Sequence, residues 1–270
     1  MTDRYAVIGN PVAHSRSPEI HAQFALVTGQ DITYERLLAP LDGFRATVDA
    51  FAAAGACGAN VTVPFKLDAY GYATELTDRA HLAGAVNTLQ FGGTHILGDN
   101  TDGVGLVRDI TDNLRVDIAG ARVLVLGAGG AARGVIGPLL EAQPAAMAIA
   151  NRTFARAQEL AGAFARRGVL RALQLTELPL HQFDLIINAT SASLNAELPP
   201  VPPICFGDGS LAYDMMYGKG ESPFMALANR AGARSVDGLG MLVEQAAEAF
   251  ALWRGVRPPT AGVLAALRES

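Results

Sequence analysis

The fold is decided by the stretch Arg122-Val123-Leu124-Val125-Leu126-Gly127-Ala128-Gly129-Gly130-Ala131-Ala132. Its first five residues are typical of a strand that is buried on both faces of a parallel sheet. The glycines match the pattern G-x-G-x-x-A, in which the first glycine allows a tight turn and the second a close approach to a pyrophosphate. We therefore expect a strand, a helix over 130–140, and a dinucleotide bound between them. The candidate cofactor residues of this turn are Gly127, Ala128, Gly129, Gly130 and Ala131. A glycine-rich turn without a ligand is the alternative interpretation.

The residues after the next expected strand, at 146–150, discriminate between two cofactors. An NAD site usually has Asp or Glu there, whereas this chain has Asn151-Arg152-Thr153, with Arg156 one turn later. A carboxylate would repel a 2′-phosphate, and a guanidinium binds phosphate through paired donors. We therefore expect NADP(H), bound through these four residues. The alternative is that both arginines only solvate a helix face.

Strand and helix patterns alternate along the whole chain, which predicts an α/β protein with largely parallel sheets. In the first part we expect strands at 5–9, 32–38 and 58–63, helices at 17–27, 41–54 and 102–114, and a hairpin pair at 86–91 and 95–97. Later we expect helices at 154–167, 239–254 and 259–268, strands at 184–188 and 211–215, and a proline-rich loop at 198–203. A domain boundary is placed near residue 102, and the last helices could belong to either half.

Composition excludes several classes of function. The 270 residues include 21 Lys and Arg against 26 Asp and Glu, a net charge of −5, which gives no broad positive surface for nucleic acid. No run of about 18 apolar residues predicts a membrane span, and the first residues lack the apolar core of a signal peptide. Cys57 and Cys205 fit two free thiols in a reducing compartment, and the histidines show no metal-ligand spacing. We expect a cytoplasmic protein without nucleic acid, membrane or metal.

Motifs along the chain resemble those of the shikimate dehydrogenase family. In the first part these motifs are His14-Ser15-Arg16-Ser17-Pro18, Asn60-Val-Thr-Val-Pro-Phe-Lys66, Gly84-Ala-Val-Asn87-Thr88 and Gly98-Asp-Asn-Thr-Asp102-Gly103. After the glycine turn they are Asn151-Arg-Thr153, Asp214-Met-Met-Tyr217 and Asp237-Gly-Leu-Gly-Met-Leu-Val-Glu-Gln245. The resemblance covers essentially the whole chain in order, which makes it far more specific than any single motif.

The resemblance implies reversible reduction of 3-dehydroshikimate to shikimate with NADPH, a step toward chorismate and the aromatic amino acids. It also implies an N-terminal α/β substrate domain, a Rossmann NADP-binding domain, and an active site in the cleft between them. The C-terminal helices then join the first domain. We therefore expect a substrate-binding and catalytic domain over 1–102 plus 239–270, and an NADP-binding domain over 103–238.

Carbonyl reduction needs a hydride donor on one face and a proton source at the oxygen, and Lys66 and Asp102 are the candidate catalytic residues. A lysine near a carboxylate can hold, deliver or retrieve the proton. Asp102, at an expected helix cap, can accept a hydrogen bond from the substrate and hold the ammonium. Which of the two moves the proton is left open. Without the motif around it, Lys66 would be interpreted as a surface lysine.

Ser15 and Ser17 are short hydroxyl donors beside a helix start, suited to a small carboxylate. Ser17 alone would be interpreted as a helix N-cap. The resemblance implies that both serines bind the substrate carboxylate, and it adds as hydrogen-bonding partners of the substrate Thr62, Asn87, Tyr217 and Gln245. It also implies that Met215 and Gly238 lie beside the nicotinamide, and that Asp78 belongs to the cofactor side.

Two other functions remain as hypotheses. One is a quinate/shikimate dehydrogenase that has looser substrate specificity or uses NAD. The serines at both Ser15 and Ser17, and the presence of Arg152, argue against it. The other is a catalytically silent NADP-binding regulator, which would not need the Lys66 and Asp102 pair. The expected partner is a small molecule, shikimate or 3-dehydroshikimate, and the protein could be a monomer or a homodimer.

Overall fold

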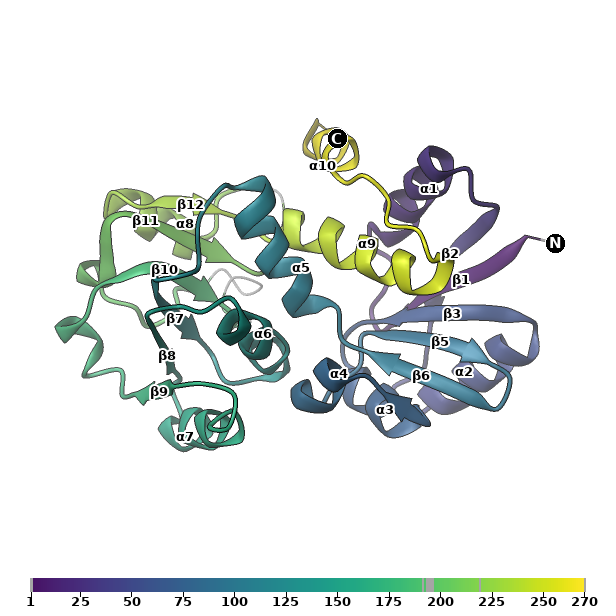
Figure 1. The fold of residues 1–270 in the computed structure, drawn as a ribbon, viewed down its shortest axis with the longest axis horizontal. Helices are drawn as coiled ribbons and strands as arrows, with labels where there is room; N and C mark the ends of the chain where they lie inside the picture. Colours follow the sequence, from purple (N-terminus) through teal and green to yellow (C-terminus); the bar gives the residue numbers. More distant parts are fainter. Residues whose placement is uncertain (1, 191, 193–196, 219, 270) are drawn as a thin grey trace. The chain divides into compact units, whose positions relative to one another are not determined.

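A computed structural model describes residues 2–190, 192, 197–218 and 220–269 of the chain. Packing divides the chain into two units, one over residues 1–105 and 243–270 and the other over 106–242. Each unit contains one six-stranded sheet with helices packed against it (Figure 1). The expected α/β fold is confirmed. The domain boundaries at 102/103 and 238/239 stay a prediction.

The sheet of the first unit has the strand order β2-β1-β3-β5-β6-β4. Its strands are β1 (Asp3–Gly9), β2 (Ile32–Leu38), β3 (Ala56–Val61), β4 (Glu75–Leu76), β5 (Thr88–Gly92) and β6 (His95–Asp99). Its helices are α1 (Ser17–Thr28), α2 (Phe44–Ala53), α3 (Lys66–Tyr72), α4 (Asp78–Ala83), most of α9 (Leu239–Arg254) and α10 (Ala261–Glu269). Strand β1 runs parallel to β2 and β3, whereas β5 runs antiparallel to both β3 and β6.

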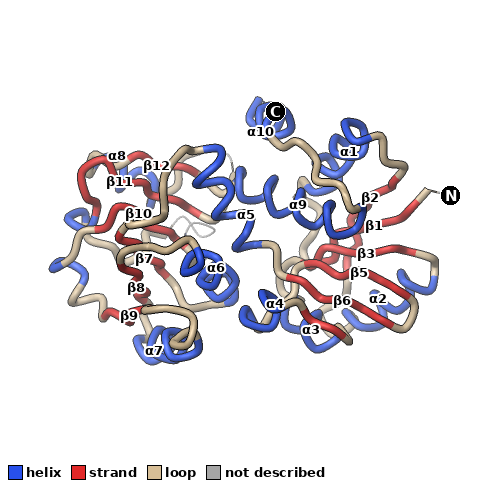
Figure 2. The backbone as a smooth tube through the Cα atoms, viewed as in Figure 1, coloured by secondary structure: helices blue, strands red, loops and turns tan. Residues whose placement is uncertain are grey.

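Alternate residues of β1 point to the two faces of this sheet, and each face is buried by a different set of helices. Ala6 and Ile8 belong to an apolar cluster with side chains of α2, α3 and α4. Tyr5 faces the other way, where it packs against Ala249 and Trp253 of α9. Helix α9, which comes late in the chain, therefore covers this face of the sheet at β1 (Figure 2).

The sheet of the second unit is parallel throughout and has the order β12-β11-β10-β7-β8-β9. Its strands are β7 (Arg122–Leu126), β8 (Ala146–Ala150), β9 (Leu170–Leu173), β10 (Phe183–Asn188), β11 (Phe206–Asp214) and β12 (Arg234–Val236). Its helices are α6 (Gly130–Glu141), α7 (Phe154–Ala163) and α8 (Pro223–Arg230), with short 3-10 turns at 178–180 and 203–205. The chain order reverses between β7 and β10, the point beyond which dinucleotides bind in Rossmann sheets.

The helix expected over 102–114 has two parts. It is α-helical over α5 (Asp102–Arg108) and continues as a π-helix over Asp109–Asn113. The buried Asp109 carboxylate accepts a hydrogen bond from the Tyr213 hydroxyl at 2.6 Å, and that hydroxyl accepts from the Met241 amide at 3.2 Å. These bonds tie the end of β11 to the start of α9. Among the residues that the structure describes, no helix is both long and apolar enough to cross a membrane.

Candidate active site

The candidate substrate residues of the first unit lie just beyond one edge of its sheet. Asn60 pairs with Thr88, and Thr88 pairs with Asp99, so three neighbouring strands reach this edge together. Because β5 is antiparallel to β3 and β6, the residue before β5 meets the residues that follow the other two strands. Asn87 and Asp102 are thereby brought together from different motifs.

Lys66 and Asp102 form an ion pair at this edge. The Lys66 Nζ atom lies 2.6 Å from Asp102 Oδ2, with 28% of the lysine side chain exposed and 10% of the aspartate. Asn87 Nδ2 donates to the other carboxylate oxygen, Oδ1, at 2.8 Å. The Thr101 amide donates to Asn87 Oδ1 at 2.9 Å, and this bond sets the orientation of the Asn87 amide. Both oxygens of Asp102 therefore accept hydrogen bonds.

Gln245 of α9 joins the same cluster. Its Oε1 atom accepts from Asn87 Nδ2 and from Thr101 Oγ1, each at 3.3 Å. A Cβ atom at Gly105 would lie 2.7 Å from the Gln245 backbone nitrogen, so glycine permits this close approach of α5 to α9. The structure thus brings together the candidates Lys66, Asn87, Asp102 and Gln245.

Ser15 and Ser17 form a buried pair at the start of α1. Ser15 Oγ donates to Ser17 Oγ at 3.2 Å and accepts from the Ser17 amide at 3.3 Å. Arg36 holds this turn, since its Nε and Nη2 atoms both donate to the Ser15 carbonyl, at 2.8 and 2.5 Å. The interpretation of Ser17 as the N-cap was wrong. Arg16 occupies the N-cap position, and Ser17 is the first helical residue.

Tyr34 and Asn60 connect the serine pair to the lysine cluster. The Tyr34 hydroxyl donates to Asn60 Oδ1 at 2.7 Å, and Asn60 Nδ2 donates to the Asn87 carbonyl at 3.3 Å. Burial raises the pKa of Tyr34 well above its ordinary value, and hydrogen bonding with Ser17 opposes part of that rise. The phenol therefore stays a neutral donor.

Thr62, one residue past β3, lies close to Gly9. A Cβ atom at Gly9 would lie 2.4 Å from the Thr62 methyl group.

The glycine turn of the second unit has the geometry of an anion site. Gly127 follows β7 with φ of +102°, and a Cβ atom there would lie 3.1 Å from the Ala189 carbonyl oxygen. Helix α6 begins at Gly130 with no side-chain cap on its N-terminus, and Gly129 and Ala131 are exposed. The amide groups of a first turn have no partner within the helix, so this end suits a pyrophosphate.

The end of β8 has the chemistry of a 2′-phosphate site. Asn151 Nδ2 donates to the Thr153 carbonyl at 2.9 Å and shapes the turn into α7. Arg152 and Arg156 are both exposed there, and the residue directly after β8 is an amide instead of a carboxylate. These residues fit NADP(H) better than NAD(H).

Met215 and Gly238, the nicotinamide candidates, are neighbours at the end of β11. A Cβ atom at Gly238 would lie 2.3 Å from the Met215 carbonyl oxygen, so only glycine allows this contact. The Gly238 amide donates to the Met216 carbonyl at 3.0 Å. The two remaining candidates are Asp78 and Tyr217. Asp78 is exposed at the first residue of α4, and Tyr217 lies in the segment after β11.

Thr101, Tyr34 and Asn188 are polar residues near the candidate groups that were not themselves sequence candidates. Thr101 is fully buried and bonds to both Asn87 and Gln245; its place inside a quoted motif was the available signal. Tyr34 had no motif around it. Asn188, buried at the end of β10, donates to Asp214 at 3.2 Å and accepts from the Thr190 hydroxyl at 2.7 Å. In the part of the chain that the structure describes, no group of three or more His, Cys, Asp or Glu is arranged to hold a metal.

Comparison with known proteins identifies the family. Models for three domains match, described as the shikimate dehydrogenase substrate binding domain over residues 7–89, shikimate / quinate 5-dehydrogenase over 107–196, and the shikimate 5′-dehydrogenase C-terminal domain over 238–268. A Herminiimonas arsenicoxydans protein named shikimate dehydrogenase (NADP(+)) is 61% identical over 99% of this chain and 98% of its own length. The chain belongs to the shikimate dehydrogenase family.

Solved structures agree with this membership. The chain is similar to an Ael1 enzyme from Pseudomonas putida, with a TM-score of 0.95, 48% identity and 98% of each chain covered. It is also similar to shikimate 5-dehydrogenase from Thermus thermophilus, solved in complex with NADP(H) and shikimate. That comparison gives a TM-score of 0.89, 33% identity and 99% coverage of each chain. The two-domain α/β architecture expected for a shikimate dehydrogenase is therefore the architecture of this chain.

Proposed function

We propose that this protein catalyses the reversible NADPH-dependent reduction of 3-dehydroshikimate to shikimate, the shikimate:NADP⁺ 3-oxidoreductase activity of aromatic amino-acid biosynthesis. The observation that carries the proposal is the 61% identity, over nearly the full length of both chains, to a protein named shikimate dehydrogenase (NADP(+)). The Thermus structure with NADP(H) and shikimate supports the same two ligands.

Lys66 supplies the proton in this proposal. NADPH, when bound, supplies the hydride, and the carbonyl oxygen that becomes a hydroxyl needs a proton. Asp102 accepts a hydrogen bond at each carboxylate oxygen, from Lys66 Nζ and from Asn87 Nδ2, so it acts as an acceptor. The ammonium is the donor of the pair. Asp102 therefore orients Lys66, and it accepts a hydrogen bond from the substrate hydroxyl.

The remaining polar groups of the first unit bind the substrate. The Ser15 hydroxyl donates to the Ser17 hydroxyl across 3.2 Å, and the two hydroxyls together suit one carboxylate. A protein with no broad positive surface binds a small acid through such local donors. The partners assigned to the ring hydroxyls or the carboxylate are Thr62, Asn87, Tyr217 and Gln245.

The second unit binds the cofactor. The pyrophosphate is assigned to the turn Gly127, Ala128, Gly129, Gly130 and Ala131, and the adenosine 2′-phosphate to Asn151, Arg152, Thr153 and Arg156. Met215 and Gly238 are assigned to the nicotinamide, and Asp78 to the cofactor side. The fit rests on the open start of α6 and on the exposed guanidinium groups after β8.

The test is an absorbance assay with purified protein, shikimate and NADP⁺ at alkaline pH, run in parallel with quinate and with NAD⁺. NADPH formation with shikimate is the expected result. Equal rates with quinate or NAD⁺ would favour the looser quinate/shikimate dehydrogenase. No turnover at millimolar shikimate, together with tight NADP⁺ binding, would favour the silent regulator and overturn the proposal.

The proposal also includes a cytoplasmic location and a monomer or homodimer as the working form. The location is proposed because the proposed activity belongs to amino-acid biosynthesis and would use cytoplasmic NADPH. Sedimentation velocity at micromolar protein separates monomer from dimer, and a larger assembly would contradict both.

A further inference from the structure

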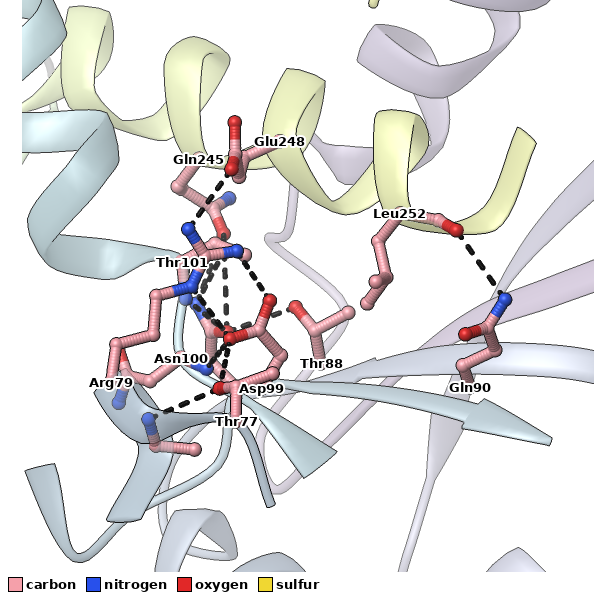
Figure 3. Close-up of polar contacts among 12 residues, drawn as sticks. Thr77, Arg79, Thr88, Gln90, Asp99, Asn100, Thr101, Gln245, Glu248 and Leu252 are labelled. Carbon is pink, nitrogen blue, oxygen red and sulfur yellow. Dashed lines mark hydrogen bonds and ion pairs between the residues drawn. The ribbon is translucent and has the colours of Figure 1, made fainter. Parts of the chain in front are cut away.

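Arg79, a residue of α4 outside the candidate site, joins two segments that carry the proposed substrate contacts (Figure 3). Its Nε and Nη2 atoms donate to the two carboxylate oxygens of Asp99, at 2.7 and 2.5 Å. Its Nη1 atom donates to Glu248 of α9 at 2.9 Å. One planar side chain therefore connects the end of β6 to α9.

The bonds between Arg79 and Asp99 affect the position of the segment that leads to Asp102. Asp99 is fully buried, and its carboxylate also accepts from the Thr77 hydroxyl at 2.6 Å and the Asn100 amide at 2.7 Å. Asn100 in turn accepts from the Asp102 amide through its side chain, at 3.2 Å. A buried carboxylate that loses its charged partner must move or take up a proton. The position of Asp102 therefore depends on Arg79.

At its other end, Arg79 bonds to Glu248, and this bond affects the position of Gln245. Glu248 and Gln245 are three apart on α9, so they share a face of the helix. Glu248 also accepts from Arg257 at 2.9 Å, which leaves its carboxylate held from two sides. In Figure 3, Arg79 reaches up to Glu248 beside Gln245 and down to Asp99 beside Thr101. Arg79 thus bridges the strand end before Asp102 and the helix that carries Gln245.

We propose that Arg79 is a positioning residue for the substrate, which sets the separation of Asp102 and Gln245 without contacting substrate or cofactor. The inference rests on the proposed function. It predicts specific requirements of the side chain, because a lysine ammonium cannot bond both oxygens of Asp99 in parallel and also reach Glu248. A purely structural arginine would instead support stability and leave the Michaelis constants unchanged.

The experiment compares three variants of the full-length protein by steady-state kinetics and thermal unfolding. Arg79→Lys removes the paired bonds to Asp99. Glu248→Gln weakens only the bond between Arg79 and α9 and leaves the paired bonds to Asp99 intact. Arg254→Lys is the matched control. Arg254 also links α9 to the sheet, through Asp3 and through Gln30 at 2.8 Å, but it does not bond to the segment 99–102.

Arg79→Lys should raise the KM for shikimate about tenfold or more, as expected for the loss of a charged hydrogen bond. Glu248→Gln should raise it by a smaller factor, and neither variant should change the KM for NADP⁺. Arg254→Lys should lower thermal stability with both KM values unchanged. In Arg79→Lys the KM for shikimate should stay raised at every pH between about 6 and 9, because lysine cannot make the two parallel bonds to Asp99 at any of them.

Equal changes in the shikimate KM for Arg79→Lys and Arg254→Lys would overturn the positioning role, as would an equal rise in both KM values. If Arg79→Lys does not fold, Glu248→Gln decides, and a wild-type shikimate KM in that variant overturns the inference. An active wild-type protein with unaffected variants overturns only the role of Arg79. A wild-type protein that does not oxidise shikimate overturns the proposed function as well.

Discussion

The imidazole ring of His21 lies parallel to the phenol ring of Tyr34, with the ring centroids 4.1 Å apart and the planes 5° apart. His21 is fully buried, and its other aromatic neighbours are Phe24, Phe250 and Trp253. Burial lowers the pKa of His21 to about 3. The ring is therefore neutral in the folded protein, although it is stacked one turn from the proposed carboxylate-binding serines.

Acid should destabilise the first unit through His21. In the unfolded chain this histidine has an ordinary pKa near 6.5, so below that pH the unfolded state binds a proton that the folded state does not. The free energy of unfolding should fall by about 2 kcal/mol between pH 6.5 and pH 4.5 from this residue alone. Urea unfolding over that pH range measures it. His21→Gln should flatten the dependence, and an unchanged slope would contradict the assignment.

Lys66→Ala should reduce kcat by about 10²–10⁴-fold, because the variant removes the proposed proton donor and leaves Asp102 without its partner at 2.6 Å. The KM for NADP⁺ should stay at the wild-type value, since Lys66 is not among the proposed cofactor contacts, all of which except Asp78 belong to the second unit. Steady-state kinetics with a parallel NADP⁺ titration measures both. A comparable loss of cofactor affinity would remove Lys66 from its assigned role.

Arg152→Ala should raise the KM for NADP⁺ and change that for NAD⁺ little, since one charge-assisted bond to phosphate contributes about 1.5–3 kcal/mol. Arg122→Ala is the control. Arg122 is equally a surface arginine, but it lies at the start of β7, where it pairs with Asp184 at 2.7 Å. The ratio of the two KM values should move only in Arg152→Ala. An unchanged ratio would exclude Arg152 from the 2′-phosphate site.

Gly129→Ala should separate cofactor binding from stability. Apart from its chain neighbours and the backbone of its own helix, no atom of the described residues lies within 4 Å of a Cβ built at Gly129, and its φ of −90° suits any residue. The melting temperature should therefore stay unchanged, while the methyl group obstructs a pyrophosphate and weakens NADP⁺ binding. Gly162→Ala in α7 is the control, because its Cβ would likewise meet no other part of the described chain within 4 Å. Wild-type NADP⁺ affinity in Gly129→Ala would place the pyrophosphate elsewhere.

The elements predicted best from the sequence are those with a single strong signal. Strands β7 and β8 have the predicted bounds because the last four residues of each are apolar and buried, as the centre of a parallel sheet requires. Helices α3 and α4 were not predicted, because at seven and six residues they are too short to show helical periodicity. The helix expected over 154–167 ends at Ala163. The helix expected from 41 begins at Phe44, after a turn in which the Gly43 amide bonds to the Pro40 carbonyl at 2.9 Å.

The sequence motifs predicted most residues of the candidate site, but they did not predict the contacts between those residues. Asn87 and Gln245 are far apart in the chain, and they meet only because α9 returns to the first sheet beside the start of β5. No local pattern encodes that return. Arg79 was not predicted for the same reason, because its two partners come from β6 and from α9, and an arginine in a short helix would be interpreted as a surface residue.

The return of α9 to the first unit also constrains the order in which the protein can mature during synthesis. The Trp253 indole donates to the Leu89 carbonyl at 3.0 Å, and its ring stacks on Tyr5, so this face of the first strand is covered only after α9 has been synthesised. The second unit is one continuous segment and is complete once residue 242 has emerged. A nascent chain on the ribosome should therefore fold its nucleotide-binding half first, while the apolar face of the earlier-made half stays uncovered until α9 has emerged.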